Sequence, residues 1–508
     1  MAFAQAAAAP AAATPAIPLR IGKVLNAISA GELKGDLSFL ASDALAGRYT
    51  PSPGLAVAAE FIASKFRAAG LEPGGDHDYF QVADMVDRRL PKVRSGLKLD
   101  TGAQVIDVAP ASVKVYQATK AANISHVPLV VFSSADTDIL KKTDVSGKAV
   151  VHEQPAFSKM PHEKAIAEYH KMRAFGHAVG LSGAAIEIVV RHSDSGVPET
   201  KLISAAEAAQ HQTPILMLTD EAVSKWLAQA GSSSGGHSFV TVNIPAPDDQ
   251  HVAFNNVVGI LRGSDPQLKS TCVLLTAHYD HIGTVETATG MASPAKKDTA
   301  DRIYNGANDD GSGTVSVIEI ARALAQLKVH PKRSMVFMTF FGEERGELGS
   351  QFYGQHPVFP IAKTVADVNL EQVGRTDSTV GKQVNTASLT GYDYSDVTKY
   401  LEKAGLLIGI KVYKDPQASD AYFTQSDNSP LAEQGVPAHS LTVAFDYPDY
   451  HGLGDEWQKI DYDNMARVDR MIALAVLNIA NDPKPPAWNA QNPKTAPFRK
   501  AQDSQVSK

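Results

Sequence analysis

The sequence predicts an α/β protein with a doubly wound, mostly parallel sheet, flanked by helices and interrupted by a small β-rich insert. Three observations predict this class. Strand-like and helix-like segments alternate over residues 256–479. Short β-branched strands separated by Gly, Ser and Asp turns fill residues 117–247. The 508 residues, 44% of them hydrophobic, exceed one ordinary domain and can form more than one core.

The first predicted elements are two helices. Leu33, Leu37 and Leu40 share one helical face, and a second periodic run over residues 55–69 ends at Gly70, a natural helix C-cap. The predicted insert then follows with two helices, over residues 163–179 and 221–230. Its four strands are predicted at 128–132, 148–151, 184–190 and 214–218, and the extended Ala-Pro segment 242–247 is predicted to bound it.

The second alternation supplies the main sheet. Its strands are predicted at 272–277, 335–341, 365–370 and 439–444, with an amphipathic helix at 313–327. In a doubly wound sheet, ligands bind beyond the carboxyl ends of the strands. The residues that follow each strand are therefore the candidates for function.

The chain divides into five predicted segments. They are a disordered leader (1–20), the N-terminal part of the main domain (21–116), the insert (117–250), the C-terminal part of the main domain (251–481) and a proline-rich, disordered tail (482–508). The Ala-rich leader has a small-x-small pattern at residues 2–4 without a complete signal peptide. We interpret it as the remnant of an export signal and expect a periplasmic or secreted protein. The alternative is an Ala/Pro leader that carries no address.

Composition excludes several classes of protein. The net charge is -7 and there is no long basic run, so we expect no nucleic-acid partner. No segment approaches the ~18 consecutive apolar residues of a membrane span. Cys272 is the only cysteine, which excludes an internal disulfide and a cysteine-based metal cluster. Any metal must therefore be held by His, Asp and Glu.

Such residues stand after the first predicted strand of the main sheet and before the predicted helix that follows it. His278 comes directly after the strand 272–277, and Asp280 is placed to hold its other ring nitrogen if His278 binds a metal. A solvated or core histidine is the alternative. Asp309 and Asp310 stand in a glycine-rich turn before the helix 313–327, where a plain helix cap is the alternative.

Three further strand ends complete the set. Glu343 and Glu344 are adjacent carboxylates at the mouth of a buried strand, a costly arrangement unless a cation neutralises them. Glu371 follows the next strand, and His451 lies in a loop after the last one. Two histidines and three carboxylates without sulfur suit Zn²⁺ or a similar ion, and the extra carboxylate suggests a metal pair. Glu343 and Glu344 would then divide into one proton-transferring base and one ligand.

These residues resemble the co-catalytic di-zinc peptidases of metallopeptidase family 28, which include bacterial aminopeptidases and glutamate carboxypeptidase. The resemblance spans roughly residues 33–471, including F-L-A-S-D-A-L-A-G-R and G-L-E-P-G-G in the N-terminal part. It implies the zinc exopeptidase fold, and S-G-K-A-V-V with G-L-S-G-A-A in the insert resembles a protease-associated domain. The main motifs are A-H-Y-D-H-I-G, N-D-D-G-S-G, F-G-E-E, N-L-E-Q-V-G-R, S-D-N, G-V-P-A and D-Y-H-G-L-G-D-E-W.

The resemblance implies a role for each candidate residue. Asp309 bridges two Zn²⁺ ions, with His278 and Glu371 completing one site and Glu344 and His451 the other. Glu343 is the general base, Asp280 supports His278, Asp310 follows the bridging residue, and Tyr450 polarises the scissile carbonyl. Three departures from the common pattern stand out: Glu371 replaces Asp, S-D-N at 426–428 replaces S-D-H, and G-L-G at 452–454 replaces Thr-Pro.

The resemblance implies a zinc exopeptidase in which a metal-bound hydroxide attacks a peptide carbonyl while Glu343 takes and returns a proton. The local sequence around the ligands is mostly acidic, which favours an aminopeptidase that binds the free amine of a peptide. Arg345 and Arg375 are nearby basic exceptions and would serve as a carboxylate clamp in a carboxypeptidase or dipeptidase. A non-catalytic receptor is the third alternative, and the oligomeric state stays open.

Overall fold

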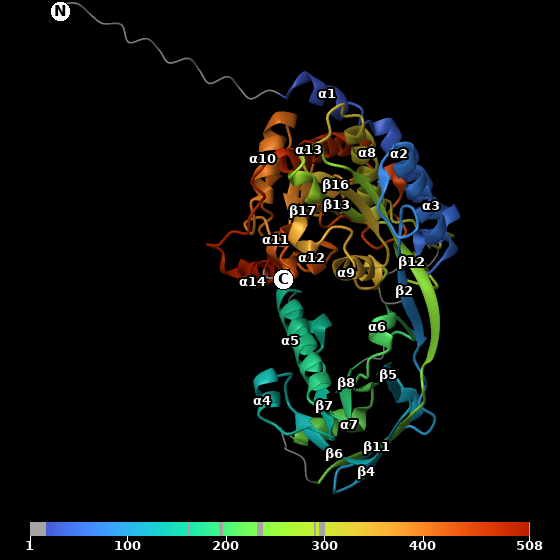
Figure 1. Ribbon diagram of the computed structural model, residues 1–508. Helices are drawn as coiled ribbons and strands as arrows, with labels where there is room; N and C mark the ends of the chain where they lie inside the picture. The colour runs from blue at the N-terminus through green and yellow to red at the C-terminus, as the bar shows by residue number, and fades with distance from the viewer. Residues whose placement is uncertain are drawn as a thin grey trace, which may run out of the picture. The chain divides into compact units, whose positions relative to one another are not determined.

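The computed structural model describes residues 17–160, 162–192, 197–230, 237–288, 291–293 and 300–506. The chain forms two compact units: Met1–Val82 with Asn255–Lys508, called the main unit, and Ala83–Phe254, called the insert (Figure 1). Because segments on both sides of Ala83–Phe254 belong to the main unit, the insert interrupts that unit in the chain order.

The main unit contains a mixed sheet that is parallel at its centre. β13 pairs in parallel with β16 and with β17, which in turn pairs in parallel with β22. β12 and β20 join antiparallel to β16 and β22. The predicted fold class is therefore confirmed. The strands are β12 (Asp248–Leu261), β13 (Cys272–His278), β16 (Ser334–Phe340), β17 (Thr364–Leu370), β20 (Thr386–Leu389), β21 (Lys411–Tyr413) and β22 (Ala438–Thr442).

Helices cover both faces of this sheet. α8 and α13 pack on β13, and α2 packs on α8 and α13, while α9 and α12 pack over β16, β17 and β22 on the other face. β13 and β16 are buried at every position, which explains their nearly continuous apolar sequence. The helices of this unit include α1 (Leu19–Leu25), α2 (Ala30–Leu40), α3 (Pro53–Ala68), α8 (Gly313–Ala325), α9 (Leu348–Gln355), α10 (Val397–Ile408), α11 (Ala418–Ala421), α12 (Asn428–Ala432), α13 (Tyr462–Asn481) and α14 (Ala496–Val506).

The insert has its own sheet and its own apolar core. Its strand order is β4-β3-β11-β6-β7-β8-β10-β5, with the run from β6 to β10 parallel. The strands are β3 (Leu97–Asp100), β4 (Val105–Val108), β5 (Val113–Gln117), β6 (Ala122–Phe132), β7 (Ala149–Glu153), β8 (Ile186–Val190), β10 (Ile215–Leu218) and β11 (Phe239–Ile244). Its helices include α4 (Thr137–Lys141), α5 (His162–Leu181), α6 (Ala205–Ala208) and α7 (Glu221–Ala230).

The boundaries of the insert differ from the predicted residues 117–250. The unit begins at Ala83, because β2 (Phe80–Arg89) runs into it and β3 to β5 belong to its sheets. Those strands are only four or five residues long, so each alternates over too few residues to stand out in the sequence. The segment predicted as a boundary, 242–247, begins inside β11, where Val240, Val242 and Ile244 are buried.

The two ends of the chain also differ from the prediction. Residues 1–16 of the predicted leader lie outside the described residues, and α1 begins at Leu19. The predicted disordered tail instead contains α14, and Trp488 is buried, donates from Nε1 to Gly435 O at 2.9 Å and stacks on Phe498. Pro497 lies in the first turn of α14, where proline removes no intrahelical hydrogen bond.

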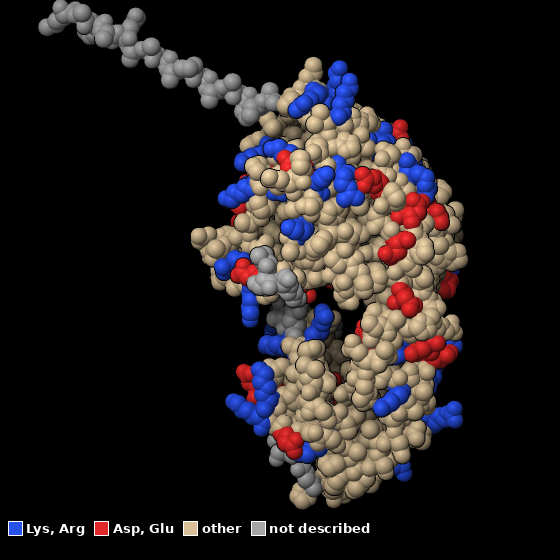
Figure 2. Space-filling model, viewed as in Figure 1, with Lys and Arg blue, Asp and Glu red and all other residues tan. Residues whose placement is uncertain are grey.

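Both signs of charge are distributed over the two units. On the face drawn in Figure 2, Lys and Arg side chains occur on each unit together with Asp and Glu side chains. None of the described helices is long and apolar enough to cross a membrane.

Candidate active site

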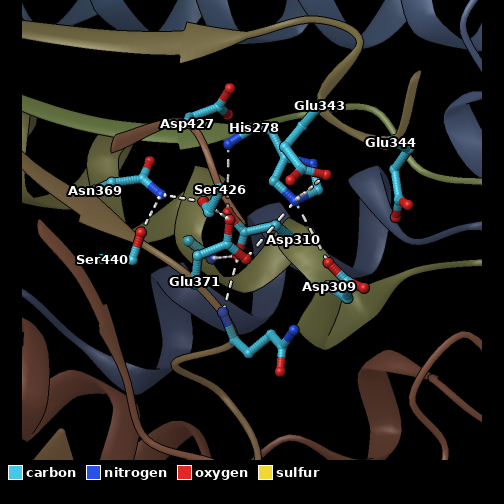
Figure 3. A network of polar contacts seen from close by, with 12 residues as sticks. His278, Asp309, Asp310, Glu343, Glu344, Asn369, Glu371, Ser426, Asp427 and Ser440 are labelled. Carbon is cyan, nitrogen blue, oxygen red and sulfur yellow. Dashed lines mark hydrogen bonds and ion pairs between the residues drawn. The ribbon is translucent and has the colours of Figure 1, made fainter. Parts of the chain in front are cut away.

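Segments at the carboxyl end of the main sheet bring the predicted residues together (Figure 3). His278 is the last residue of β13, and Glu371 directly follows β17. Glu343 and Glu344 begin the short turn after β16. Asp309 lies in the turn that leads into α8. All five predicted ligands, including His451, have close contacts within this cluster.

The first group of contacts surrounds His278, which is buried. Its Nε2 lies 3.4 Å from Asp309 Oδ1, 3.8 Å from Glu371 Oε2 and 3.9 Å from Glu343 Oε2. Its Nδ1 donates to the backbone oxygen of Asp280 at 3.2 Å and lies 3.5 Å from Asp280 Oδ1. Asp280 therefore orients the ring so that Nε2 faces the carboxylates.

The second group surrounds Glu344. His451 Nε2 lies 3.3 Å from Glu344 Oε2 and 3.1 Å from Asp309 Oδ2. His281 Nδ1 lies 2.8 Å from Glu344 Oε1. Asp309 thus presents one carboxylate oxygen to His278 and the other to His451. Two sets of His and carboxylate donors share a single aspartate.

His281 is a residue that the sequence reasoning passed over. It is fully buried, and its ring occupies the space beside Gly306, where a Cβ would lie 2.4 Å from the imidazole. His281, Asp309 and Glu344 lie within the reach of one metal ion, as do His278, Asp310 and Glu371. The sequence signal for His281 was its position as the second histidine of the H-Y-D-H run, which follows the same strand as His278.

Asp310 has the capping role that was the alternative interpretation in the sequence. Its Oδ1 accepts hydrogen bonds from Gly313 N at 3.0 Å and Gln372 N at 3.1 Å, and its Oδ2 accepts from His278 N at 3.3 Å. The carboxylate therefore ties the turn before α8 to the ends of β13 and β17. Burial raises the pKa of Asp310 well above its usual value, and Glu371 adds to that effect.

A metal ion fits this donor set. Among the described residues, His281 Nε2 is buried without a hydrogen-bond partner, whereas the buried oxygens Asp309 Oδ2 and Glu344 Oε1 have as neighbours His451 Nε2 and His281 Nδ1 of the same cluster. Buried polar atoms of this kind are costly unless something satisfies them. A divalent cation would satisfy them and neutralise the carboxylates at once. Nitrogen and oxygen donors without sulfur are compatible with Zn²⁺.

The two adjacent glutamates have opposite electrostatic environments. Burial raises the pKa of Glu343 well above its usual value, and the neighbouring carboxylates of Glu371 and Glu344 raise it further. Glu344 is also buried, yet the nearby His451 and His281 lower its pKa to about 2. Glu343 is suited to hold a proton and Glu344 to remain anionic.

The loop that carries Tyr450 and His451 is held by buried ionic contacts. Arg375 pairs bidentately with Asp377, and its Nη1 lies 3.0 Å from Asp449 Oδ2. Asp455 accepts hydrogen bonds from Asn308 N and Asp309 N, and from Tyr447 Oη at 2.9 Å. Asp455 stands four residues after His451 in the D-Y-H-G-L-G-D-E-W motif. Sequence reasoning assigned it no role.

Tyr450 projects partly into solvent beside the cluster. Its side chain is 42% exposed, and its ring stacks on His451 with 4.1 Å between the centroids. The neighbouring basic residues are both engaged: Arg375 as described, and Arg345 with the ring and hydroxyl of Tyr49 and with Thr50 O. Arg375 is thus paired with two carboxylates, whereas Arg345 uses Nη1 for both of its hydrogen bonds.

Part of the chain matches a known family. Residues 256–476 match the sequence profile of "Peptidase family M28", and the main unit, which contains them, is called the peptidase unit from here on. The match begins in β12 and ends in α13, so it includes all five predicted ligands.

Individual relatives are more distant. The chain is 24% identical to a vacuolar membrane protease of Lodderomyces elongisporus over 43% of this chain and 22% of that protein. It is 26% identical to leucine aminopeptidase 1 of Pyrenophora teres f. teres over 50% of this chain and 61% of that protein. The chain thus spans about a fifth to three fifths of the length of these curated relatives.

The fold is shared with a solved structure. An aminopeptidase from Aneurinibacillus sp. strain AM-1 superposes with a TM-score of 0.53 over 90% of this chain and 95% of that chain, at 18% identity. At this level of identity the likeness concerns the fold. It agrees with the zinc exopeptidase architecture predicted from the sequence.

Proposed function

We propose that this protein is a zinc-dependent aminopeptidase that removes one residue at a time from the N-termini of peptides. The observation that carries the proposal is Asp309, whose two carboxylate oxygens face two separate sets of His and carboxylate donors. This arrangement suits two metal ions with a bridging carboxylate. His278 and Glu371 would hold one Zn²⁺ with Asp309, and Glu344 and His451 would hold the other.

Zinc bound in this cluster would supply Lewis-acid chemistry, lowering the pKa of a water molecule and polarising a carbonyl oxygen. Glu343 is the proposed general base: it takes a proton from the attacking water and returns it to the departing amine. Its raised pKa brings proton exchange closer to neutral pH. Asp280 accepts from the backbone N–H of Glu343 at 3.1 Å and from Thr50 Oγ1 at 3.0 Å, and so links the base to the His278 segment.

The aminopeptidase polarity rests on the charges around the cluster. A carboxypeptidase requires a cationic group for the free carboxylate of its substrate. Arg375 is buried and paired with Asp377 and Asp449, and Arg345 donates from Nη1 to Tyr49 Oη and Thr50 O. The surrounding carboxylates favour an ammonium group instead. The curated relatives named leucine aminopeptidase support the same polarity.

Tyr450 is proposed to polarise the scissile carbonyl, since its side chain is exposed next to His451. The insert is proposed to be a protease-associated domain, and no described residue of it belongs to either candidate metal group. We also propose that the protein is exported. The Ala-rich leader pattern supports that proposal.

The proposal is tested with a panel of free, N-acetylated and C-amidated dipeptides, each assayed with and without a strong chelator. We expect chelation to abolish hydrolysis, added zinc to restore it, and two zinc ions to be present per chain. N-acetylation should block cleavage, and C-amidation should have little effect. Zinc content well below one ion per chain would refute the metal site. Resistance of the amidated peptides alone would instead indicate a carboxypeptidase.

A further inference from the structure

A serine hydroxyl contacts one of the candidate zinc ligands directly. Ser426 Oγ donates a hydrogen bond to Glu371 Oε1 at 2.5 Å, whereas Glu371 Oε2 lies 3.8 Å from His278 Nε2. The two oxygens of this carboxylate therefore have different partners. One oxygen accepts the hydrogen bond from Ser426, and the other faces His278 among the candidate zinc ligands (Figure 3).

We infer that Ser426, itself oriented by Asn369, is a positioning residue that fixes the carboxylate of Glu371 for zinc binding. The inference rests on the proposed zinc site. A glutamate side chain has three rotatable bonds, so its carboxylate can reach several positions unless a neighbour restrains it. The hydrogen bond from Ser426 removes that freedom before a metal ion binds, which is how partners outside the ligand set raise metal affinity.

The direction of each hydrogen bond around Ser426 follows from the amide of Asn369. Asn369 Nδ2 donates to Ser426 Oγ at 2.8 Å and to Ser440 Oγ at 3.0 Å. An amide nitrogen has two protons and accepts none. Both hydroxyls therefore act as acceptors toward Asn369, and their own protons point away from it. The proton of Ser440 goes to Asn428 Oδ1 at 2.8 Å, and the proton of Ser426 goes to Glu371.

This network is rigid because it is buried and built on paired strands. Asn369 in β17 lies opposite Ser440 in β22 in the parallel ladder, and both side chains are buried. The segment that carries Ser426 is anchored by the next residue, Asp427, whose Oδ1 accepts from Ser350 Oγ at 2.5 Å. The S-D-N motif at 426–428 thus has a physical role: Ser426 contacts the candidate ligand Glu371, Asp427 contacts Ser350 in α9, and Asn428 contacts Ser440 in β22.

Ser426→Ala tests the inference through zinc affinity, measured by competition with a chromophoric chelator. We expect the dissociation constant of one zinc ion, the one that Glu371 and His278 would hold, to rise about 10–100-fold. Ser426→Thr keeps the hydroxyl and should restore most of the affinity. Ser419→Ala is the matched control, because Ser419 is also a fully buried serine but contacts Leu389 O and Tyr392 N. It should leave zinc affinity within about threefold of the wild type.

A double-mutant cycle separates positioning from a general effect on folding. Glu371→Asp shortens the ligand by one methylene and withdraws it from Ser426. In that background, Ser426→Ala should cost no further zinc affinity beyond about threefold. Equal losses in both backgrounds, or an unchanged affinity for Ser426→Ala alone, would overturn the inference. A wild-type protein that binds no zinc would instead refute the proposed function on which the inference rests.

Discussion

Replacing Arg48 by methionine should destabilise the peptidase unit by about 3 kcal/mol. The guanidinium group is buried and donates to four backbone oxygens: to Tyr279 O at 2.8 Å, Leu40 O at 2.6 Å, Asn305 O at 2.7 Å and Gly306 O at 2.9 Å. Gly306 O also accepts from Gly311 N at 3.1 Å, so three of these oxygens would lose their donor. A buried acceptor left without its donor costs about 1–3 kcal/mol, so three at the lower bound give the expected value. That loss is a large part of the ~5–15 kcal/mol that stabilises a typical domain.

The charge of Arg48 adds to this effect. Burial lowers its pKa to about 10, while the nearby carboxylates, led by Asp280 and Asp455, favour the charged form. Arg48 therefore also compensates part of the negative charge beneath the candidate active site. Methionine fills similar space, and it avoids the complication of glycine, which would relieve the positive φ of 47° at this position.

Urea unfolding followed by tryptophan fluorescence measures the loss. The chain has three tryptophans, of which Trp226 lies in the insert and Trp457 and Trp488 in the peptidase unit. In a Trp226→Phe background the signal reports the peptidase unit alone. Arg262→Met is the control, since Arg262 forms an exposed ion pair with Glu72 and should cost at most about 1 kcal/mol. A value for Arg48→Met within 1 kcal/mol of the control would refute the reasoning.

Three further predictions concern the metal site and the insert. Glu343→Gln should lower turnover by roughly 10²–10⁴-fold with normal zinc content, because Glu343 is proposed as a base and not as a ligand. Zinc loss in Glu343→Gln, with zinc retained in Glu344→Gln, would mean that the two roles are reversed. Removing zinc with a chelator should lower the free energy of unfolding of the peptidase unit by about 4 kcal/mol if zinc had been present at about 1,000 times its Kd. An unchanged urea midpoint would contradict that expectation. Single substitution of His152, His177, His192 or His211 in the insert should leave zinc stoichiometry unchanged, and a loss of one zinc per chain would show that the insert supplies a ligand.

The order of elements in the peptidase unit and the residues at its strand ends could be predicted from the sequence alone. The predicted strand at 272–277 is β13, Cys272–His278, and the predicted helix at 313–327 is α8, Gly313–Ala325. Such elements are predictable because their apolar periodicity is local and because buried parallel strands require continuous apolar runs. Parallel strands also place their carboxyl ends at one edge, so the clustering of His278, Glu343 and Glu371 could be expected from the chain order alone.

The contacts of these residues could not be predicted from the sequence and are known from the tertiary structure. The division of the Asp309 oxygens between His278 and His451, the contact of His281 with Glu344, and the hydrogen bond from Ser426 to Glu371 join residues far apart in the chain. The tail was mispredicted for the same reason, since Trp488 and Phe498 pack into a core that its own sequence does not contain. A local sequence pattern indicates the propensity of a segment for helix or strand. The contacts, burial and pKa of a side chain depend on the neighbours that tertiary packing brings to it.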